Sequence, residues 1–187
     1  RSKVIYKSTD GGSTWTNIST GINTTGVNMT YIEISPTDPN KVWVTLSGYV
    51  SGKKIYTTTN AGSTWTNFST GLPNLPANCI VYENASPDRV YIGMDAGVYY
   101  TDSTLSSWMP YSANLPNVII SELEIQYTGE KLRAATYGRG LWQSDLLTSG
   151  ISETVNCSDE CLKIFPNPTN GSFEITFESK TNSAYLI

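Results

Sequence analysis

The sequence contains no histidine, and this absence excludes a large part of enzyme chemistry within its 187 residues. Ser-His-Asp and Cys-His nucleophilic systems, and metal sites built on histidine, all need an imidazole. No phosphate-binding loop of the G-x-x-x-x-G-K-[ST] type occurs, and Gly138-Arg139-Gly140 is too short for a dinucleotide fingerprint. We therefore expect no bound cofactor and no metal in this stretch.

Charged residues are scarce, at 15% of the chain, and acidic residues outnumber basic ones. The 12 Lys and Arg against 16 Asp and Glu give a net charge of −4. A nucleic-acid surface needs a basic face, which these scattered cations do not supply, so no nucleic-acid partner is expected. No apolar run is long enough to span a bilayer. Because the sequence begins at Arg1 without a methionine or a signal peptide, we expect a piece of a longer precursor.

Cysteine is rare as well, with three residues in all. Cys79 lies in an expected strand and is predicted to be a buried thiol. Cys157 and Cys161 are close enough to form a small local disulfide in an oxidising compartment. Two cysteines without a histidine do not complete the usual zinc ligand set, so a zinc site is not favoured.

The abundant residues are Thr, Ser, Asn, Gly and Tyr, a mixture typical of extracellular β structure with many turns. The sequence Ser-Thr-Asp-Gly-Gly-Ser-Thr-Trp at 8–15 returns as Thr-Thr-Asn-Ala-Gly-Ser-Thr-Trp at 58–65. A degenerate third copy, Thr-Asp-Ser-Thr-Leu-Ser-Ser-Trp, occupies residues 101–108. We call these three segments the turn motifs. Their spacing shows that the chain is built from repeats.

The turn motifs are predicted to be structural. An Asp or Asn two residues after a hydroxyl can accept bonds from turn N–H groups, and glycine supplies the backbone angles of a tight hairpin. The final tryptophan is a large apolar body suited to packing between neighbouring sheets. The carboxylate changes from Asp10 to Asn60 and then to Ser103, which a turn tolerates and a repeated reactive site would not. The motif residues assigned this structural role are Ser8, Asp10, Gly12, Trp15, Thr58, Asn60, Gly62, Trp65 and Trp108.

An aromatic residue recurs in step with the turn motifs, as Tyr6, Tyr56, Tyr99 and Trp142, at steps of 50, 43 and 43 residues. It marks the third strand of each four-stranded unit. The first strands are predicted at 29–35, 78–83 and 121–127, the second at 41–46, 89–94 and 131–136, and the fourth directly after each motif tryptophan. The last unit lacks a motif and a fourth strand, so 139–146 is predicted to be the closing strand.

Antiparallel four-stranded units of this length are typical of β-propeller blades. A β-sandwich also has short strands and turns. It would not, however, repeat the same aromatic, hydroxyl and tryptophan residues at fixed positions in successive units. We therefore predict an all-β chain whose residues 1–146 are the C-terminal blades of a β-propeller. Because the first unit begins at its third strand, the opening part of the propeller is expected to be missing.

The turn motif resembles the Asp-box, S-x-D-x-G-x-T-W, of the bacterial neuraminidase repeat in sialidase-like, xyloglucanase-like and sortilin-like β-propellers. In those families the ligand lies on the face opposite the Asp-box turns. Here that face is made by the loops between second and third strands and by the links between units. The resemblance therefore implies these ligand-binding candidates: Tyr49, Asp95, Tyr137, Arg139, Asn74 and Asn117. The alternative is that they are simple solvated loop residues.

The resemblance also raises glycoside hydrolysis, which needs two acids at a defined separation. The sequence does not place Asp95 or Glu122 opposite a second acid. The arginine cluster that binds sialic acid in sialidases has no counterpart among the few arginines of this sequence. No catalytic residue is assigned. We expect an exported protein that binds glycans or surfaces, and the alternative is a secreted glycoside hydrolase whose catalytic residues lie largely in missing blades.

After a polar linker at 147–162, a new pattern begins. The run Lys-Ile-Phe-Pro-Asn-Pro-Thr-Asn-Gly-Ser-Phe-Glu-Ile at 163–175 resembles the start of the C-terminal sorting domain, a β-sandwich, that the type IX secretion system of Bacteroidetes reads. The alternative is an ordinary β-sandwich module. The sorting-motif residues are Phe165, Pro166, Asn167, Pro168, Gly171, Phe173 and Ile175, followed by an alternating strand at 172–177. The resemblance implies export across the outer membrane to the medium or cell surface, with the type IX outer-membrane machinery as partner.

Overall fold

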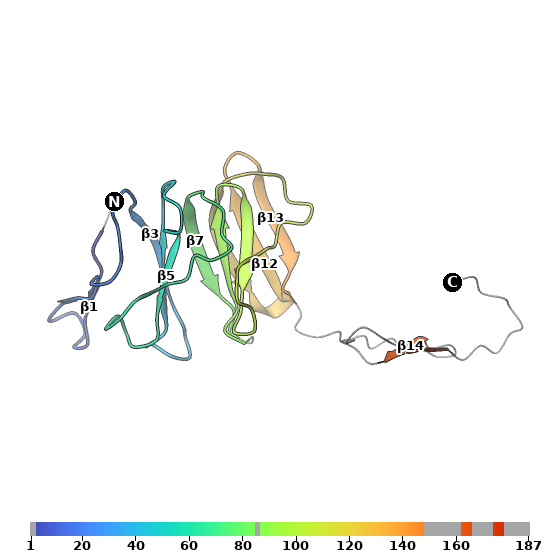
Figure 1. The fold of residues 1–187 in the computed structure, drawn as a ribbon, viewed down its shortest axis with the longest axis horizontal. Coiled ribbons are helices and arrows are strands. Elements are labelled where there is room, and N and C mark those ends of the chain that lie inside the picture. Colours follow the sequence, from blue (N-terminus) through green and yellow to red (C-terminus); the bar gives the residue numbers. More distant parts are fainter. Residues whose placement is uncertain (1–2, 85–86, 148–161, 166–173, 178–187) are drawn as a thin grey trace, which may run out of the picture. The chain divides into compact units, whose positions relative to one another are not determined.

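The computed structural model describes residues 3–84 and 87–147, together with two short strands at 162–165 and 174–177 (Figure 1). The chain divides into two compact units, Arg1–Leu147 and Thr148–Ile187. The larger unit is a row of antiparallel sheets, and the smaller one holds the two short strands. Among the described residues, no helix is long and apolar enough to cross a membrane.

Four sheets follow one another along the larger unit, and we number them as blades. Blade 1 is β1 (Tyr6–Lys7) and β2 (Thr16–Asn17), and blade 2 is β3 (Met29–Ile34), β4 (Val42–Leu46), β5 (Ile55–Thr58) and β6 (Thr66–Asn67). Blade 3 is β7 (Ala77–Tyr82), β8 (Val90–Met94), β9 (Gly97–Thr101) and β10 (Met109–Pro110). Blade 4 is β11 (Ile120–Gln126), β12 (Lys131–Thr136) and β13 (Gly140–Asp145).

Each complete blade is an antiparallel meander in sequence order, as the repeat predicts. The aromatic series falls on the third strands, where Tyr56 faces Val44, Tyr99 faces Ile92 and Trp142 faces Ala134. Among the described residues, β13 pairs with β12 and forms the edge of its sheet.

The predicted first strands differ from those observed by one residue at one end or at both ends. The prediction of strand through Tyr127 is wrong, because Tyr127–Gly129 forms a turn of 3-10 helix (η1). Each first strand also carries a register shift near its start, between Met29 and Tyr31, between Ala77 and Cys79, and between Ile120 and Glu122. A bulge at the same place in all three blades adds one residue whose side chain is re-aimed.

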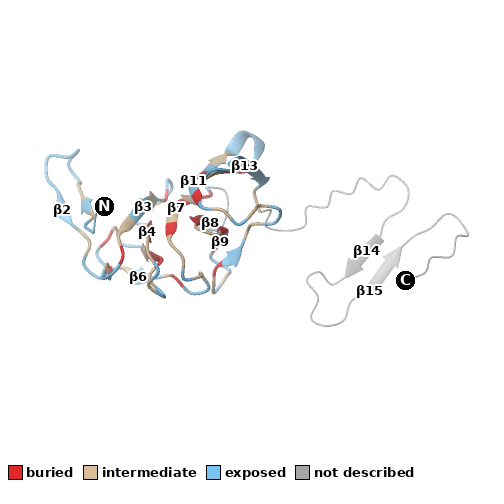
Figure 2. Ribbon diagram, turned by 90° about the horizontal axis from the view of Figure 1, so that it is seen from above, coloured by how far each residue is buried: buried red, intermediate tan, exposed pale blue. Residues whose placement is uncertain are grey.

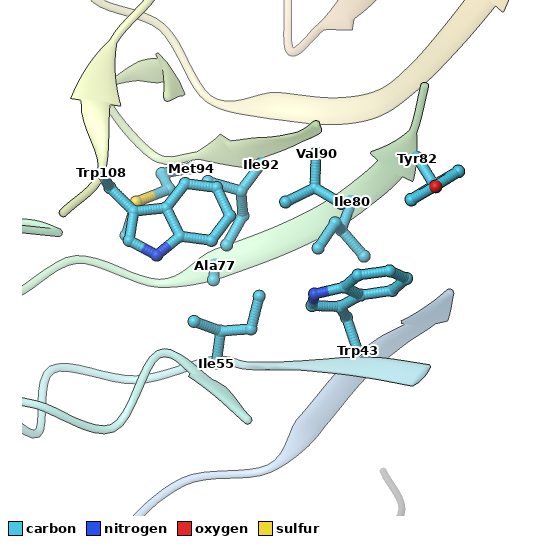
Figure 3. Close-up of a cluster of buried hydrophobic side chains, with 9 residues drawn as sticks. All are labelled: Trp43, Ile55, Ala77, Ile80, Tyr82, Val90, Ile92, Met94 and Trp108. Carbon is cyan, nitrogen blue, oxygen red and sulfur yellow. The ribbon is translucent and has the colours of Figure 1, made fainter. Parts of the chain in front are cut away.

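The cores lie between blades, because the central strands of blades 2 and 3 bury side chains on both faces. Both β4 and β8 are buried along their whole length, as expected of central strands (Figure 2). Between blades 2 and 3, Trp43 and Ile55 point toward Ile80 and Ala77 of the next sheet (Figure 3). Clusters around Tyr56 and around Leu123 fill the other two junctions.

Cys79 lies on β7 in the cluster around Leu123 and is fully buried, which confirms the predicted buried thiol. Burial raises the pKa of its thiol to about 12. Cys157 and Cys161 lie outside the described residues, so their predicted disulfide stays a prediction.

The smaller unit contains β14 (Leu162–Phe165) and β15 (Glu174–Phe177), paired antiparallel with Ile164 opposite Ile175. The strand β15 lies within the alternating strand predicted at 172–177, and β14 was not predicted. Of the sorting-motif residues, Phe165 and Ile175 lie on these strands. The remaining ones are Pro166, Asn167, Pro168, Gly171 and Phe173, which lie outside the described residues.

Candidate functional site

The two ends of the blades differ in the loops that they carry. The turn motifs and the connections between first and second strands make one face, which we call the turn face. The connections between second and third strands and the links between blades make the opposite one, the loop face. The resemblance implies a ligand on the loop face.

The first turn motif is closed by its own side chains. The Ser8 hydroxyl donates to Asp10 Oδ1 at 2.8 Å and accepts the Gly12 N–H at 2.7 Å. Asp10 also accepts the Thr14 N–H at 2.9 Å and the Thr14 hydroxyl at 2.7 Å. These bonds, those from Thr14 first, lower the pKa of Asp10 from 3.8 to about 2. The carboxylate is therefore saturated by its own turn.

The second motif repeats the turn with an amide in place of the carboxylate. Asn60 Oδ1 accepts the Thr64 N–H at 2.9 Å, and its Nδ2 donates to the Thr64 hydroxyl at 2.8 Å. In the third motif the acid stands one position earlier, and Asp102 accepts the Thr104 N–H at 2.9 Å. The three motifs are turns, and none presents a free acid for chemistry.

The motif tryptophans pack onto the preceding blade. The Trp65 indole donates to the Ile18 carbonyl at 2.7 Å, and the Trp108 indole to the Phe68 carbonyl at 2.6 Å. Trp108 is 3% exposed. Trp15 has no such blade beside it among the described residues, and its indole is 61% exposed. The second and third tryptophans therefore contact the blade before their own.

One loop-face connection is much longer than the others. Residues 47–54 join β4 to β5, whereas 95–96 and 137–139 join the matching strands of blades 3 and 4. The longer loop carries Tyr49, whose ring is 66% exposed. It forms one wall of a cavity of 650 Å³ between blades 2 and 3, which we call the loop-face pocket. Its lining includes Ser47, Tyr49, Thr30, Asn78 and Asp95.

The polar groups of the pocket are held by neighbouring strands. Asn78 Nδ2 donates to Asp95 Oδ1 at 3.0 Å and to the Ile120 carbonyl at 3.2 Å. The Thr30 hydroxyl donates to the Ala77 carbonyl at 2.7 Å. Thr30 and Asn78 are the added bulge residues of β3 and β7. The bulges thus turn two polar side chains toward the junction of neighbouring blades.

The structure brings two of the six predicted loop-face residues into the pocket, Tyr49 and Asp95. The other four lie elsewhere on the loop face and are exposed, with Tyr137 at 73%. They are Tyr137, Arg139, Asn74 and Asn117. The sequence did not identify Thr30 and Asn78 as pocket residues. A β-bulge cannot be recognised from the alternation of a strand sequence until the pairing register is known.

A second group of acids lies apart from the pocket. Glu33 and Glu122 line a cavity of 580 Å³ along the first strands of blades 2 to 4, together with Glu124. Burial, followed by the charge of Glu122, raises the pKa of Glu33, while the Tyr82 N–H bond at 3.1 Å opposes the shift. Asp95 is not in this lining, so Asp95 and Glu122 belong to different cavities. Among the described residues, no cluster of acidic or cysteine side chains is arranged to hold a metal.

Comparison with known proteins identifies the family. A family model described as sortilin, neurotensin receptor 3, matches residues 3–137. The chain belongs to the Sortilin-Vps10 family. No curated protein sequence matches it significantly.

Two solved structures show that this Sortilin-Vps10 chain has the β-propeller fold. The GH74 xyloglucanase from Xanthomonas campestris superposes with a TM-score of 0.57 at 13% identity, over 74% of this chain and 25% of its own. YCF48 from Cyanidioschyzon merolae superposes with a TM-score of 0.50 at 14% identity, over 93% of this chain and 52% of its own. The Sortilin-Vps10 chain thus spans a quarter to about half of these proteins. At such identities the likeness concerns the fold, and it confirms the predicted propeller blades.

Proposed function

We propose that this chain belongs to an exported bacterial β-propeller protein that binds a glycan in the loop-face pocket. The observation that carries the proposal is the placement of Tyr49 and Asp95 on one pocket. An exposed aromatic ring next to a few fixed polar groups is the usual composition of a small-ligand site. Two of the resemblance-implied residues stand there, one of them on the longest loop.

The chemistry of the pocket suits a sugar. A carboxylate accepts hydrogen bonds from sugar hydroxyls. Asn78 donates to Oδ1 of Asp95, and the second carboxylate oxygen, Oδ2, is the acceptor that we assign to a sugar hydroxyl. The Asn78 bond fixes the orientation of that carboxylate before a ligand arrives, which lowers the entropy cost of binding. Tyr49 offers an apolar ring face with a polar edge, which matches the mixed surface of a pyranose.

A binding role is favoured over hydrolysis by the count of acids in the pocket. Glycoside hydrolysis uses two carboxyl groups on either side of the bond that is cut. Asp95 is the acid among the described lining residues, and Glu122 lies on the other cavity. A secreted glycoside hydrolase completed by further blades is the second candidate, favoured by the fold that the chain shares with a xyloglucanase.

Xyloglucan oligosaccharides are the first ligands to test, and a glycan array is the screen. We expect Tyr49→Ala and Asp95→Asn each to weaken binding about tenfold or more, the effect of losing an anchoring contact. Tyr137→Ala is the matched control, because that tyrosine is exposed on the loop face outside the pocket lining. Equal binding by Tyr49→Ala and the unchanged chain would remove the pocket as the site. Release of reducing sugar from a bound oligosaccharide would favour the hydrolase.

Export is proposed to depend on the segment from Lys163 onward, read by the type IX outer-membrane machinery. Its support is the run of residues at 163–175 and its likeness to that sorting domain, with the turn motifs read as Asp-boxes of a secreted repeat. A reporter fused to residues 147–187 should reach the medium or cell surface of a type IX-competent bacterium. Retention of the fusion in the periplasm, beside a known sorting domain that is exported, would remove this proposal.

A further inference from the structure

A buried lysine stands at the end of the longest loop on the loop face. Lys54 is the last residue of the 47–54 loop, and 1% of its surface is exposed. Among the described residues, none of the ion pairs includes it. Burial lowers the pKa of its ammonium group, because the water that would solvate the charge is excluded. A buried cation without an anion beside it costs folding free energy, so Lys54 contributes something other than an ion pair.

The ammonium group of Lys54 holds the main chain next to Tyr49. Its Nζ donates to the Gly48 carbonyl at 2.7 Å. Gly48 precedes Tyr49 in the chain, and both residues line the loop-face pocket. The φ of Gly48 is +95°, and a Cβ at this position would lie 3.2 Å from the Val27 side chain. Glycine therefore allows the loop to lie close to the link between blades 1 and 2 while its carbonyl accepts the lysine bond.

The two ends of the loop are bound to the same link. At the start of the loop, the Ser47 N–H donates to the Asn28 carbonyl at 2.8 Å. Near its end, the Lys53 ammonium group donates to Asn23 Oδ1 at 2.9 Å and to the Thr25 carbonyl at 3.1 Å. These bonds fix where the loop begins and ends, and the lysine bond to the glycine carbonyl fixes the segment that carries the aromatic ring.

Lys54 can influence the pocket without contacting a ligand. It is not among the described lining residues of the pocket, whereas Gly48 and Tyr49 are. The Tyr49 ring is 66% exposed, so packing contributes little to its position. The position of the ring therefore follows from the main chain that carries it. A ligand that contacts this ring binds more tightly when the main chain is already in place, because less conformational entropy is lost.

We propose that Lys54 is a positioning residue of the loop-face pocket, which holds Tyr49 in place for the ligand through the Gly48 carbonyl. This inference rests on the proposed function, since it takes Tyr49 as a ligand contact. Groups with perturbed ionisation gather at functional sites, and a buried charge that lowers stability is retained there for what it positions. Lys54 thus exchanges some folding stability for a fixed aromatic ring.

The first test needs no ligand. Lys54→Met removes the ammonium group and keeps a long, unbranched side chain. NMR relaxation of the unchanged chain should give the Tyr49 amide an order parameter of about 0.85, and Lys54→Met should lower it to about 0.6 or less. The melting temperature should stay equal or rise, because a buried charge is gone. Lys3→Met is the matched control, since it removes the same charge from an exposed lysine.

Two results of this test would contradict the inference. An unchanged order parameter at Tyr49 in Lys54→Met would mean that the lysine does not fix the loop. A melting temperature well below that of Lys3→Met would mean that Lys54 serves the fold as a whole.

A measurement on the unchanged chain covers the case in which Lys54→Met does not fold. With isotope-labelled lysine side chains, the ammonium protons of Lys54 should exchange slowly enough to be observed and should show a scalar coupling across the hydrogen bond to the Gly48 carbonyl. Exposed Lys3 is the internal control, and its ammonium protons should exchange too fast to be seen. Equally fast exchange at both lysines would overturn the inference.

Binding of a xyloglucan oligosaccharide separates this inference from the proposed function. Lys54→Met should weaken binding severalfold, and it should cause no further loss in a Tyr49→Ala chain, because the lysine acts through that ring. Equal losses in the two backgrounds would overturn the positioning role. If the unchanged chain does not bind the oligosaccharide and Lys54→Met still loses order at Tyr49, the result counts against the glycan function and supports the positioning of the loop.

Discussion

The side-chain amide of Asn78 donates to the main-chain carbonyl of Ile120 at 3.2 Å, across the junction between blades 3 and 4. One junction earlier, the Thr30 hydroxyl donates to the Ala77 carbonyl at 2.7 Å. Ala77 and Ile120 each begin the first strand of their blade, and Thr30 and Asn78 are the bulge residues one blade before. The bulges therefore join neighbouring blades by a repeated polar bond at the loop-face end.

This repeated bond predicts a stability loss in Asn78→Ala of about 1–3 kcal/mol, because the Ile120 carbonyl loses its side-chain donor. The same change releases Asp95 from its 3.0 Å contact, so glycan affinity should fall as well. Urea unfolding followed by tryptophan fluorescence gives the first quantity. Asn74→Ala, an exposed amide on the link between blades 2 and 3, is the control and should change stability by less than about 0.5 kcal/mol. Equal stability in the two variants would contradict the role of the bond.

Two motif tryptophans should respond differently to truncation. Trp65→Ala removes a ring that packs on blade 1 and an indole bond of 2.7 Å, so we expect a loss of about 3 kcal/mol. Trp15→Ala acts on a ring that is 61% exposed and bonds to its own turn, at Gly12, so its cost should stay within about 0.5 kcal/mol. Chemical denaturation of both variants is the comparison. A similar cost for both would mean that burial between blades is not what makes Trp65 matter.

How much of this could be read from the sequence depends on the range of each interaction. Repeat phase is a local property, so the turn motifs and the Tyr56, Tyr99 and Trp142 series placed the third strands and the blade order correctly. Strand alternation is local too, and the observed first strands differ by about one residue from the predicted ones. The exception at Tyr127 arises where the chain closes a tight 3-10 turn before β12.

The pocket was harder to predict because it depends on contacts between blades. Tyr49 and Asp95 were selected by topology together with Tyr137 and Arg139, and the sequence has no means of saying which loops converge. The length of the 47–54 loop determines which loops share a pocket, because this loop is long enough to form one side of a cavity against blade 3. Asn78 was placed in a strand, and its bond to Asp95 follows from a bulge that appears with the pairing register.

Asp10 provides a test of the turn geometry by pH. Its pKa is lowered to about 2, mainly by the two bonds from Thr14. A lowered carboxyl pKa contributes stability above the unfolded value, near 3.8, and that contribution is lost as the pH falls through the folded value. NMR titration should find Asp10 near pH 2. In Thr14→Ala the Asp10 pKa should move up, because the hydroxyl donor is gone, whereas Thr9→Ala, beside the turn, should leave it in place. A titration near 4 in the unchanged chain would mean that the turn bonds do not persist in solution.

A buried arginine between two acids predicts the largest single loss of stability. The Arg89 side chain is 2% exposed and lies 3.4 Å from Glu83 and 3.5 Å from Asp102, both of them buried. Arg89 also donates to the Leu147 carbonyl, while the Tyr91 hydroxyl accepts the Leu147 N–H at 3.1 Å. This cluster joins β8, the third turn motif and the end of blade 4. Removing the cation leaves two buried carboxylates without it, which typically costs about 3–5 kcal/mol.

Arg89→Met tests this cost, because methionine fills much of the space without the charge. The matched control is Lys131→Met, which removes the cation of a pair whose other member, Asp145, is 79% exposed. Exposed pairs contribute about 1 kcal/mol or less, so the control should unfold close to the unchanged chain in urea. Adding Glu83→Gln and Asp102→Asn to Arg89→Met should restore part of the loss, since the uncompensated charges are then gone. If Arg89→Met and Lys131→Met unfold at the same urea concentration, the buried cluster does not hold the end of blade 4 against blade 3.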